Sequence, residues 1–355
     1  MRKIRVLVVD DSMFMRRMIS DLLSQDAAIE VVGTARNGQE GLEKARALKP
    51  DVITLDVEMP VMDGVTMLQK LMQEQPTPVL MLSSLTTEGA EITLKCLELG
   101  AVDFITKPSG SISLDIYKIS SQIIEKVKAA AQARVAATSV PTQATAVVSP
   151  ARAVIARRGG DAPLVVIGAS TGGPRALSVV MSSLPADLEA KILLIQHMPE
   201  GFTRSLAERL DRNSPFIVRE AQGDEVLEPG VAFLAQGGKH LKVERGSRLV
   251  LTQDPPVHGV RPAVDVALLS IAQNYPGKVV VAILTGMGSD GAAGVRALYA
   301  KGAYTIAEDE STCVVFGMPR AAIQTGCVKR VVPLDQVAQA ITEGVKELCS
   351  SSRAA

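Results

Sequence analysis

The chain has 355 residues, a length that favours two domains over one. Hydrophobic residues make up 47% and charged residues 21%, so the composition supplies buried cores and excludes a predominantly disordered chain. Because 38 basic residues balance 38 acidic ones, the chain has no net positive charge with which to hold nucleic acid or an anionic membrane surface, and only a local patch could do so.

The cysteines and the N-terminus indicate a reducing, aqueous compartment. The four cysteines lack C-x-x-C spacing, so neither a zinc site nor a disulfide framework is indicated. The first apolar run, Ile4–Val9, contains Arg5 and stops at Asp10, which makes it too short for a signal peptide. No stretch approaches the roughly 18 uncharged apolar residues that would span a bilayer. We therefore expect a cytoplasmic protein that is not inserted in a membrane.

The first part of the chain alternates short apolar runs with segments of helical periodicity. The expected strands are Ile4–Val9, Ile29–Thr34, Val52–Leu55, Val79–Leu82 and Phe104–Ile105. The expected helices are Phe14–Leu23, Gly38–Ala47, Gly64–Glu74, Glu88–Leu99 and Leu114–Lys128. This alternation predicts an α/β domain over residues 1–125, with a doubly wound five-stranded parallel sheet covered on both faces.

The composition changes after the first domain. From about Ala129 to Gly160 the chain is rich in Ala, Thr, Ser, Gln, Val and Pro and has no sustained periodicity. Residues 126–160 are therefore predicted to be an interdomain linker, helical at its start and flexible later.

A second α/β pattern is predicted over residues 161–350. The expected strands are Leu164–Ile167, Lys191–Gln196, Ala232–Leu234 and Val279–Leu284, with Leu249–Thr252 as a hairpin or edge strand. The expected helices are Pro174–Ser183, Phe202–Asp211, Val264–Asn274 and Ala292–Lys301. The pattern predicts a Rossmann-like domain with a mixed, mostly parallel sheet.

Polar side chains lie at the ends of the strands expected in the first domain. Asp10 and Asp11 follow the first strand, Asp56 follows the third, Ser83 comes at the end of the fourth and Lys107 follows the fifth. In a parallel sheet these positions share the carboxyl edge, where crowded carboxylates favour a divalent cation such as Mg²⁺. An aspartate beside that cation can accept a phosphoryl group, whose charge Lys107 and Ser83 would stabilise.

This pattern resembles the response-regulator receiver family. The matching stretches are Val6–Ser12, Leu55–Gly64 and Phe104–Pro108. The resemblance implies that Asp56 is the phosphoacceptor and that Asp10 and Asp11 hold Mg²⁺ together with it. It also implies that Phe104 takes the aromatic switch position. The alternative is that Phe104 is an ordinary, half-buried aromatic residue of a strand.

A serine lies on a glycine-rich turn after the strand Leu164–Ile167. The turn, Gly168–Pro174, carries Ser170 between glycines and leads into a helix, whose N–H groups suit a developing oxyanion. Dinucleotide binding is the alternative, but it requires an acidic residue at the end of the next strand. That strand ends in Gln196 and His197 instead, and no Walker lysine is present.

Three histidines are candidates for the base that would activate this serine. His197 alone is expected at a carboxyl edge, beside the edge that carries Ser170. His240 is expected in a turn after a strand, with a structural or rim-forming role. His258 lies in a proline-rich loop, distant from any expected strand end, and is interpreted as solvated.

An aspartate should orient the imidazole, and Asp290 is the preferred candidate. The strand Val279–Leu284 runs into a glycine-rich turn that carries Asp290, so it belongs to the same rim. The alternative is that Asp290 only caps the following helix. Asp265 and Asp309 are the other candidate acids, and Asp265 is interpreted as a first-turn residue of its helix.

The signatures of the second domain resemble those of the protein-glutamate methylesterase CheB family. The matching stretches are Gly168–Gly173, Gln196–Pro199, Leu284–Gly291 and Arg261–Asp265. The order Ser170, His197, Asp290 differs from the Ser, Asp, His order of α/β-hydrolases, which indicates a separate occurrence of the triad. Backbone N–H groups of Met287 and Thr171 are the expected oxyanion donors.

The resemblance implies a phosphorylation-activated hydrolase that removes methyl esters from glutamates of methyl-accepting chemoreceptors. It also implies glutamine deamidation, a chemotaxis histidine kinase as phosphodonor, Mg²⁺ for phosphorylation and no cofactor for ester hydrolysis. We expect the unphosphorylated receiver to cover the rim that holds Ser170. The alternative, a receiver-controlled binding module, requires a basic recognition helix, but Glu208 and Asp211 interrupt the arginines of Thr203–Arg212.

Overall fold

The computed structural model describes residues 2–84, 86–107, 115–133, 135 and 162–351. The chain divides into two compact units, Met1–Ala144 and Thr145–Ala355. The predicted linker falls largely on residues 136–161, which lie outside the described residues, and its boundaries stay a prediction. Among the described residues, no helix is both long and apolar enough to cross a membrane.

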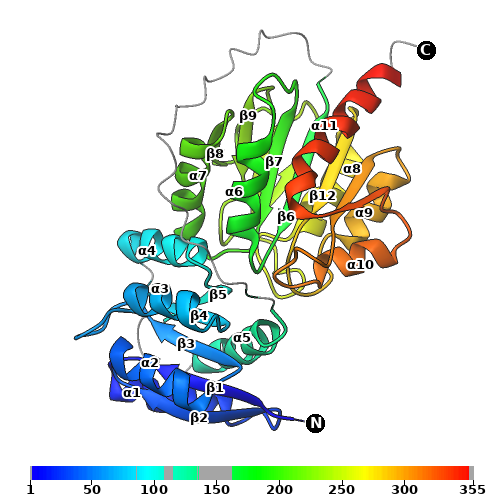
Figure 1. The fold of residues 1–355 in the computed structure, drawn as a ribbon. Helices are drawn as coiled ribbons and strands as arrows, with labels where there is room; N and C mark the ends of the chain where they lie inside the picture. The colour runs from blue at the N-terminus through cyan, green and yellow to red at the C-terminus, as the bar shows by residue number, and fades with distance from the viewer. Residues whose placement is uncertain (1, 85, 108–114, 134, 136–161, 352–355) are drawn as a thin grey trace. The chain divides into compact units, whose positions relative to one another are not determined.

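The first unit is a doubly wound α/β domain (Figure 1). Its strands are β1 (Ile4–Val9), β2 (Ile29–Ala35), β3 (Val52–Asp56), β4 (Val79–Ser83) and β5 (Asp103–Thr106). Its helices are α1 (Met13–Leu23), α2 (Gly38–Leu48), α3 (Gly64–Glu74), α4 (Thr87–Glu98) and α5 (Asp115–Ala130). The strand order is β2-β1-β3-β4-β5 and every pairing is parallel, so the predicted sheet is confirmed.

Local sequence signals start the helices of this unit. In four helices, a side chain at the N-cap accepts a hydrogen bond from the backbone N–H three residues later; the capping residues are Ser12, Asn37, Asp63 and Thr86. Such caps satisfy one of the free N–H groups at a helix start. Each helix therefore begins close to the end of a strand, and the strand ends gather at one edge.

The second unit is built around a seven-stranded sheet in the order β14-β13-β12-β6-β7-β9-β8 (Figure 1). Its strands are β6 (Leu164–Ala169), β7 (Lys191–Gln196), β8 (Ile217–Glu220), β9 (Val231–Leu234), β12 (Val279–Ile283), β13 (Tyr304–Glu308) and β14 (Arg330–Val332). Every pairing in this sheet is parallel. Antiparallel pairing occurs in a separate hairpin, β10 (His240–Val243) with β11 (Leu249–Thr252). The mostly parallel fold is thus confirmed, but the hairpin does not join the main sheet.

Helices cover both faces of the second sheet. They are α6 (Gly173–Ser183), α7 (Phe202–Asn213), α8 (Val264–Asn274), α9 (Ala292–Tyr299), α10 (Met318–Gln324) and α11 (Leu334–Ser351). Helix α6 contacts α7 and α11 on one face, while α9 contacts α8 and α10 on the other. All residues of β6 and β7 are buried, as expected for central strands with helices on both sides.

The strand order of the second unit places a topological switch at β6. From β6 the chain builds outward through β7 in one direction, and it later returns to build β12, β13 and β14 in the other. In open α/β sheets, ligands bind outside the carboxyl ends of strands at such a switch. The carboxyl ends of β6 and its two neighbours are therefore where the fold favours a site.

Candidate functional site

Three carboxylates converge at the carboxyl edge of the first sheet. Asp10 follows β1, Asp11 comes next, and Asp56 is the last residue of β3; one oxygen of each lies within 4.8 Å of the others. Asp10 and Asp56 are buried, whereas Asp11 is exposed. The strands β1 and β3 flank the switch point of this sheet, so the pocket stands where the topology favours ligand binding.

Lys107 balances part of this negative charge. Its Nζ atom lies 2.7 Å from Asp56 Oδ2 and 3.2 Å from Asp10 Oδ2. Burial raises the pKa of Asp56 to about 6; the charge of Asp10 adds to this effect and the hydrogen bond from Lys107 opposes it. Although burial works against the Lys107 ammonium, its contacts with Asp56 and Asp10 raise the pKa of the lysine. One cation is thus shared between two buried carboxylates.

The pocket has the donor set of a magnesium site. Carboxylate oxygens are the ligands that Mg²⁺ takes in proteins, usually one or two of them together with water or phosphate oxygens. The buried Oδ2 atom of Asp10 accepts no hydrogen bond within the described part of the chain, although Lys107 is close by. Exposed Asp11 would leave a bound ion accessible to water and phosphate. The residues present fit such an ion.

Ser83 and Phe104, the other residues expected at this site, are both buried. Ser83 is the last residue of β4, and its hydroxyl accepts a hydrogen bond from Thr93 and lies 3.3 Å from the Gly89 carbonyl oxygen. Phe104 in β5 is buried, and the Lys126 ammonium lies 5.3 Å from its ring centroid. The Ser83 hydroxyl would have to leave these partners before it could bind a phosphoryl oxygen.

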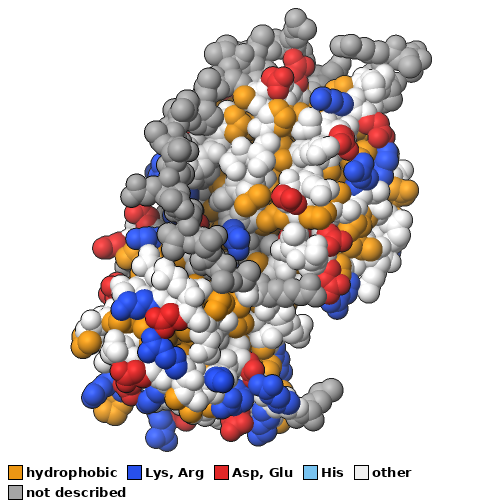
Figure 2. Space-filling model, viewed as in Figure 1, with side chains coloured by type: hydrophobic (Ala, Val, Ile, Leu, Met, Phe, Trp, Pro, Cys, Tyr) orange, Lys and Arg blue, Asp and Glu red, His pale blue; other side chains and the backbone are white. Residues whose placement is uncertain are grey.

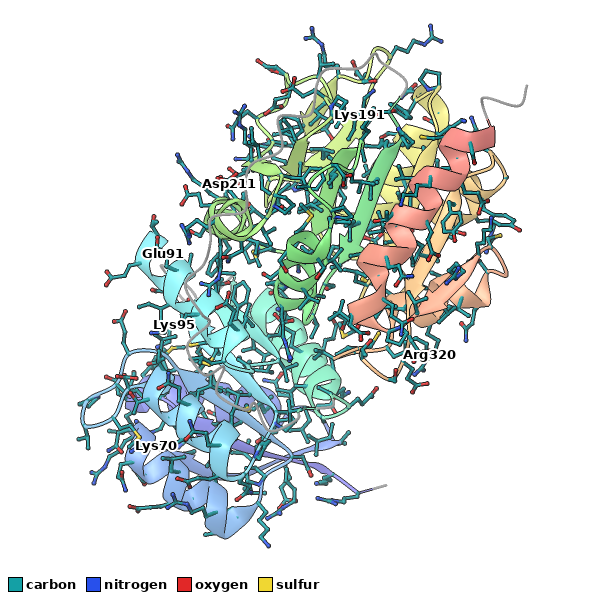
Figure 3. All side chains as sticks on the ribbon, turned by 45° about the horizontal axis from the view of Figure 1, so that its top comes forward. Lys70, Glu91, Lys95, Lys191, Asp211 and Arg320 are labelled. Atoms are coloured by element: carbon teal, nitrogen blue, oxygen red, sulfur yellow. The ribbon has the colours of Figure 1, made fainter. Side chains whose placement is uncertain are left out.

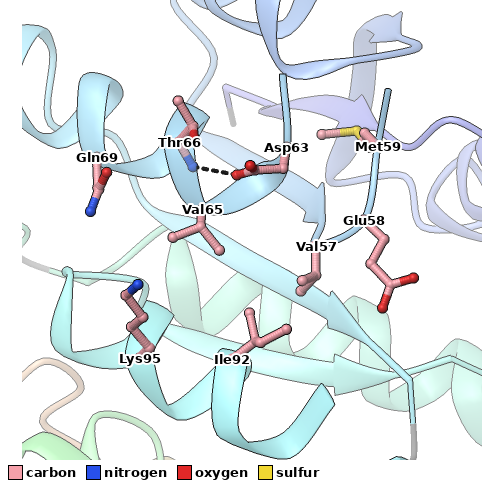
Figure 4. Close-up of a pocket in the computed structure, with 9 residues that line it drawn as sticks. All are labelled: Val57, Glu58, Met59, Asp63, Val65, Thr66, Gln69, Ile92 and Lys95. Carbon is pink, nitrogen blue, oxygen red and sulfur yellow. Dashed lines mark hydrogen bonds between the residues drawn. The ribbon is translucent and has the colours of Figure 1, made fainter. Parts of the chain in front are cut away.

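A shallow groove of about 600 Å³ lies near the acidic pocket (Figure 4). Its lining residues, which come from the loop after β3 and from α3 and α4, are Val57, Glu58, Met59, Asp63, Val65, Thr66, Gln69, Ile92 and Lys95. Asp63 accepts the Thr66 N–H as the cap of α3. None of the three clustered carboxylates lines the groove, so it is a neighbour of the pocket and not a part of it.

In the second unit, Ser170 stands on the turn between β6 and α6. The turn closes through a hydrogen bond from Gly173 N–H to the Ser170 carbonyl, 2.8 Å. Gly172 caps α6 with φ of 79°, a left-handed conformation that glycine adopts without strain. Within the described residues the Ser170 hydroxyl makes no hydrogen bond, and the residue is half-buried. The turn therefore presents an accessible hydroxyl at the carboxyl edge of β6.

His197 and Asp290 form the strongest contact at this rim. His197 follows β7 directly, and its Nε2 atom lies 2.7 Å from Asp290 Oδ2. The side chains of the two residues are only 8% and 2% exposed. The His197 N–H also donates to the Ala169 carbonyl. This hydrogen bond joins the backbone of His197 to the residue before Ser170. The structure thus brings together the ends of β6, β7 and β12, as predicted.

Asp290 also holds the start of another helix. Its carboxylate accepts the N–H groups of Val264 at 2.6 Å and of Asp265 at 2.8 Å, in the first turn of α8. Burial alone would raise the pKa of Asp290, but His197 and these two N–H groups outweigh it and lower the pKa. The alternative in which Asp290 caps the helix that follows it is wrong, because the N-cap of α9 is Gly291.

Gln196 ties the serine turn to the histidine. Its buried amide donates to the Ser170 carbonyl at 2.8 Å and to the His197 carbonyl at 3.0 Å. The sequence analysis noted Gln196 only as the neighbour of His197. Its role depends on two carbonyl groups that meet only in the folded sheet.

Glu308 and Thr285 fix the third loop of the rim. The buried Glu308 carboxylate accepts the Thr285 N–H at 2.8 Å, and burial raises the pKa of Glu308. Thr285 in turn accepts the Ser170 N–H on its carbonyl and donates its hydroxyl to the Thr171 carbonyl. The sequence analysis missed Glu308, because it lies in a strand that was not predicted.

The next residues of this loop approach Ser170 closely. A Cβ atom on Gly286 would lie 2.7 Å from Ser170 Cβ, so only glycine permits this packing. Met287 follows, and its N–H donates no hydrogen bond within the described part of the chain. Thr171, the other expected oxyanion donor, is buried directly after Ser170.

The two remaining histidines occupy different surroundings from those expected. His240 is the first residue of β10 and is fully buried; its ring bonds to Ala263 N–H and to the Pro255 carbonyl, a structural role. His258 is exposed, as expected, but the interpretation of it as distant from the strand ends is wrong. Its Nε2 atom lies 3.0 Å from Asp265 Oδ2 and 3.9 Å from Asp290 Oδ1.

Asp309 and Lys191 make contacts of their own with other residues. Asp309 accepts hydrogen bonds from Ser311 within its own turn. Lys191, the first residue of β7, is buried at the opposite edge of the sheet, with its ammonium 5.6 Å from the ring centroid of Tyr275 (Figure 3). These groups therefore have structural roles and leave the rim to Ser170, His197 and Asp290.

The folds and pockets define a class of protein: a receiver-type domain followed by an α/β enzyme domain. The family model for the response regulator receiver domain matches residues 6–116, and the model for CheB methylesterase matches residues 165–341. The chain belongs to the CheB methylesterase family.

Relatives match the chain over almost its whole length. A Symbiobacterium thermophilum protein named protein-glutamate methylesterase/protein-glutamine glutaminase is 51% identical over 355 residues, which cover 98% of each chain. A Geobacillus kaustophilus protein of the same name is 52% identical and covers 98% of this chain and 100% of its own. The crystal structure of the Thermotoga maritima CheB methylesterase catalytic domain covers 51% of this chain and 97% of its own, with 42% identity and a TM-score of 0.49.

Proposed function

We propose that this chain is a phosphorylation-controlled serine hydrolase that removes methyl esters from glutamate side chains of chemoreceptors. In this proposal Ser170 is the nucleophile, His197 the general base and Asp290 the group that orients the imidazole. The 2.7 Å contact between His197 and Asp290, next to the turn that carries Ser170, is the observation that supports it best. The names of the relatives support the same activity and add glutamine deamidation.

The geometry suggests how the rim would carry out the acyl transfer. Because Asp290 engages Nε2 of His197, Nδ1 is the ring nitrogen left to take the proton of the Ser170 hydroxyl. The Ser170 oxygen attacks the ester carbonyl, and the protonated imidazole then returns its proton to the departing methanol. Water, activated by the same nitrogen, hydrolyses the acyl-enzyme. A glutamine amide would follow the same steps with ammonia as the leaving group.

Backbone N–H groups would stabilise the oxyanion of each tetrahedral intermediate. Met287 has an N–H without a hydrogen-bond acceptor among the described residues, on the loop that packs against Ser170. Thr171 is the second proposed donor, at the turn that leads into α6. Preorganised donors of this kind commonly contribute a factor of about 10²–10³ in turnover.

In the receiver, Asp56 is the proposed phosphoacceptor. Asp10, Asp11 and Asp56 would hold Mg²⁺, which neutralises the carboxylates and the incoming phosphate. Lys107, already bonded to Asp56, is placed to bind the added phosphoryl oxygens, and Ser83 would do so after leaving its present partners. A chemotaxis histidine kinase is the proposed phosphodonor, and Phe104 the proposed switch residue.

A binding module without catalysis has less support. On the face shown in Figure 2, acidic and basic side chains lie among one another, without the basic stripe that a nucleic-acid surface requires. In α7, Arg204 lies 3.5 Å from Glu208, so this arginine is paired with an acid on the same helix. The family matches likewise favour an enzyme.

The central test is methanol release from methylated receptor membranes by the full-length chain. Ser170→Ala should lower turnover by about 10³-fold or more, as in other serine triads. Ser182→Ala is the matched control, because Ser182 is an exposed serine of the neighbouring helix whose hydroxyl bonds only to the Val179 carbonyl. A serine-directed fluorophosphonate should label the wild type and the control but not Ser170→Ala. Near-normal methanol release by Ser170→Ala would overturn the assignment.

A further inference from the structure

A second imidazole–carboxylate pair lies beside the rim. His258 Nε2 is 3.0 Å from Asp265 Oδ2, and Asp265 donates its own N–H to Asp290 Oδ1 at 2.8 Å. His258 Nε2 is also 3.9 Å from Asp290 Oδ1. Asp290 therefore has one histidine bonded to one oxygen and a second histidine near the other.

Asp265 and Asp290 are two buried carboxylates that lie side by side. Burial raises the pKa of Asp265, and the charge of Asp290 adds to this effect, whereas Gly294 N–H and His258 oppose it. Asp265 Oδ1 accepts the Gly294 N–H at 2.8 Å, and the residue lies in the first turn of α8, where the helix dipole favours a negative charge. These contacts favour the ionised form of Asp265, against the effects of burial and of Asp290.

Within the described residues, few ionisable groups face this pair. His197 approaches from the loop after β7, Asp290 from the loop after β12 and His258 from the loop before α8. His240 of β10 faces the start of the same helix through the Ala263 N–H. From α9 the contact is the neutral Gly294 N–H. His258 is thus the imidazole bonded to Asp265, since His197 already binds Asp290.

We propose that His258 is a positioning residue for the hydrolysis, which pairs with Asp265 so that His197 faces the charge of Asp290 alone. This inference rests on the proposed function of Ser170, His197 and Asp290. No hydrogen bond joins His258 to Ser170 among the described residues, and its side chain is 41% exposed, so we expect it to act through the two carboxylates. Its backbone is in the left-handed region, with φ of 53°.

Removal of the imidazole would leave the Asp265 carboxylate without its hydrogen bond to His258. The added negative potential favours the protonated form of His197, which cannot act as a base. The loss of activity on acidification should then begin at a higher pH, by about 0.5–1 pH unit for a charge at this distance. Removal of the Asp265 charge should shift the acidic side of the pH–activity profile to lower pH.

The test compares kcat/KM for methanol release at pH 6 with that at pH 8.5, in full-length variants on methylated receptor membranes. The ratio cancels any difference in the fraction of folded enzyme. His258→Asn suits the left-handed backbone and should lower the ratio about 3- to 10-fold. Asp265→Asn should raise it, and the double variant should lose the decrease caused by His258→Asn. Ser247→Asn, with φ of 63° in the β10–β11 hairpin, is the matched control and should keep the wild-type ratio.

The outcomes separate this inference from the proposed function. An unchanged or increased ratio in His258→Asn would show that the imidazole does not shield Asp265. A decreased ratio that persists in the double variant would also overturn the inference, because the effect would not pass through Asp265. Loss of the proposed function is reported separately by Ser170→Ala: if that variant is active, neither assignment stands.

Discussion

At the scale of single residues, the acidic pocket shows how burial changes the properties of an aspartate. Asp56 shares Lys107 with Asp10, and its burial in β3 raises its pKa to about 6. A bound cation would favour the ionised form of this carboxylate. Without a cation, the burial of ionised Asp56 lowers the free energy of unfolding of the receiver.

The first prediction concerns the pH dependence of that stability. The pKa of Asp56 rises from 3.8 in the unfolded chain to about 6 in the folded one, so between these values the folded state binds the extra proton. The contribution of this group is present at low pH and is lost as the pH rises through 6. Without divalent cations, the free energy of unfolding of the receiver should fall by on the order of 2 kcal/mol between pH 4 and 7.

Asp56→Asn provides the comparison, because it removes the titrating group while it keeps a similar shape. Urea unfolding of the full chain in the presence of a chelator should show a smaller fall over the same pH range in this variant. Mg²⁺ should stabilise the wild-type receiver more at pH 7.5 than at pH 5, since binding requires the ionised carboxylate. An identical pH dependence in the variant and the wild type would contradict this account.

At the scale of elements, the start of α8 depends on a residue from another segment. The N-cap of α8 is Ala263, which has no side-chain acceptor, and Asp290 accepts the first N–H groups in its place. The same carboxylate binds His197. The orientation of the His197 imidazole and the start of α8 therefore depend on the same side chain.

We predict that Asp290→Ala loses both activity and stability. The buried N–H groups of Val264 and Asp265 would lose their acceptor, which should lower the free energy of unfolding by about 2–4 kcal/mol. Ser170→Ala should be as inactive, yet lie within about 0.5 kcal/mol of the wild type, because its hydroxyl makes no hydrogen bond among the described residues. Denaturant unfolding and hydrogen exchange at the amides of α8 would measure the difference. Equal stability of the two variants would show that the cap contributes nothing.

At the scale of the whole molecule, each unit has its own parallel sheet, its own core and its own switch point. A receiver joined to a catalytic unit on one chain implies that phosphorylation regulates the second unit. The acidic pocket and the serine rim are each built entirely from residues of one unit.

Deletion of residues 1–160 should raise basal methanol release by about tenfold, a typical size for coupling between two sites. The truncated chain should also become insensitive to a small phosphodonor, whereas the full chain should be activated by it. A folded fragment with an unchanged or lower rate would argue against restraint by the receiver. Circular dichroism of the fragment would establish that it is folded.

Most elements of the first unit could be predicted because its signals are local. Apolar runs of strand length alternate with amphipathic segments, and caps such as Ser12 and Asp63 mark where helices start. In the second unit, β8, β10, β13, β14, α10 and α11 were not predicted. Strand β14 has only three residues, and β13 ends in the buried, charged Glu308, which an apolar pattern does not reveal.

The sequence by itself determined the residue types at each strand end, the glycine-rich turns around Ser170 and Asp290, and the α/β class of both units. Only the tertiary structure decided that Asp290 caps α8, that Gln196 joins two loops and that His258 lies beside Asp265. Periodicity and turn chemistry act over a few residues, so they can be read along the chain. The partners of a buried carboxylate depend on strand order and helix packing, which bring together residues that are far apart in sequence.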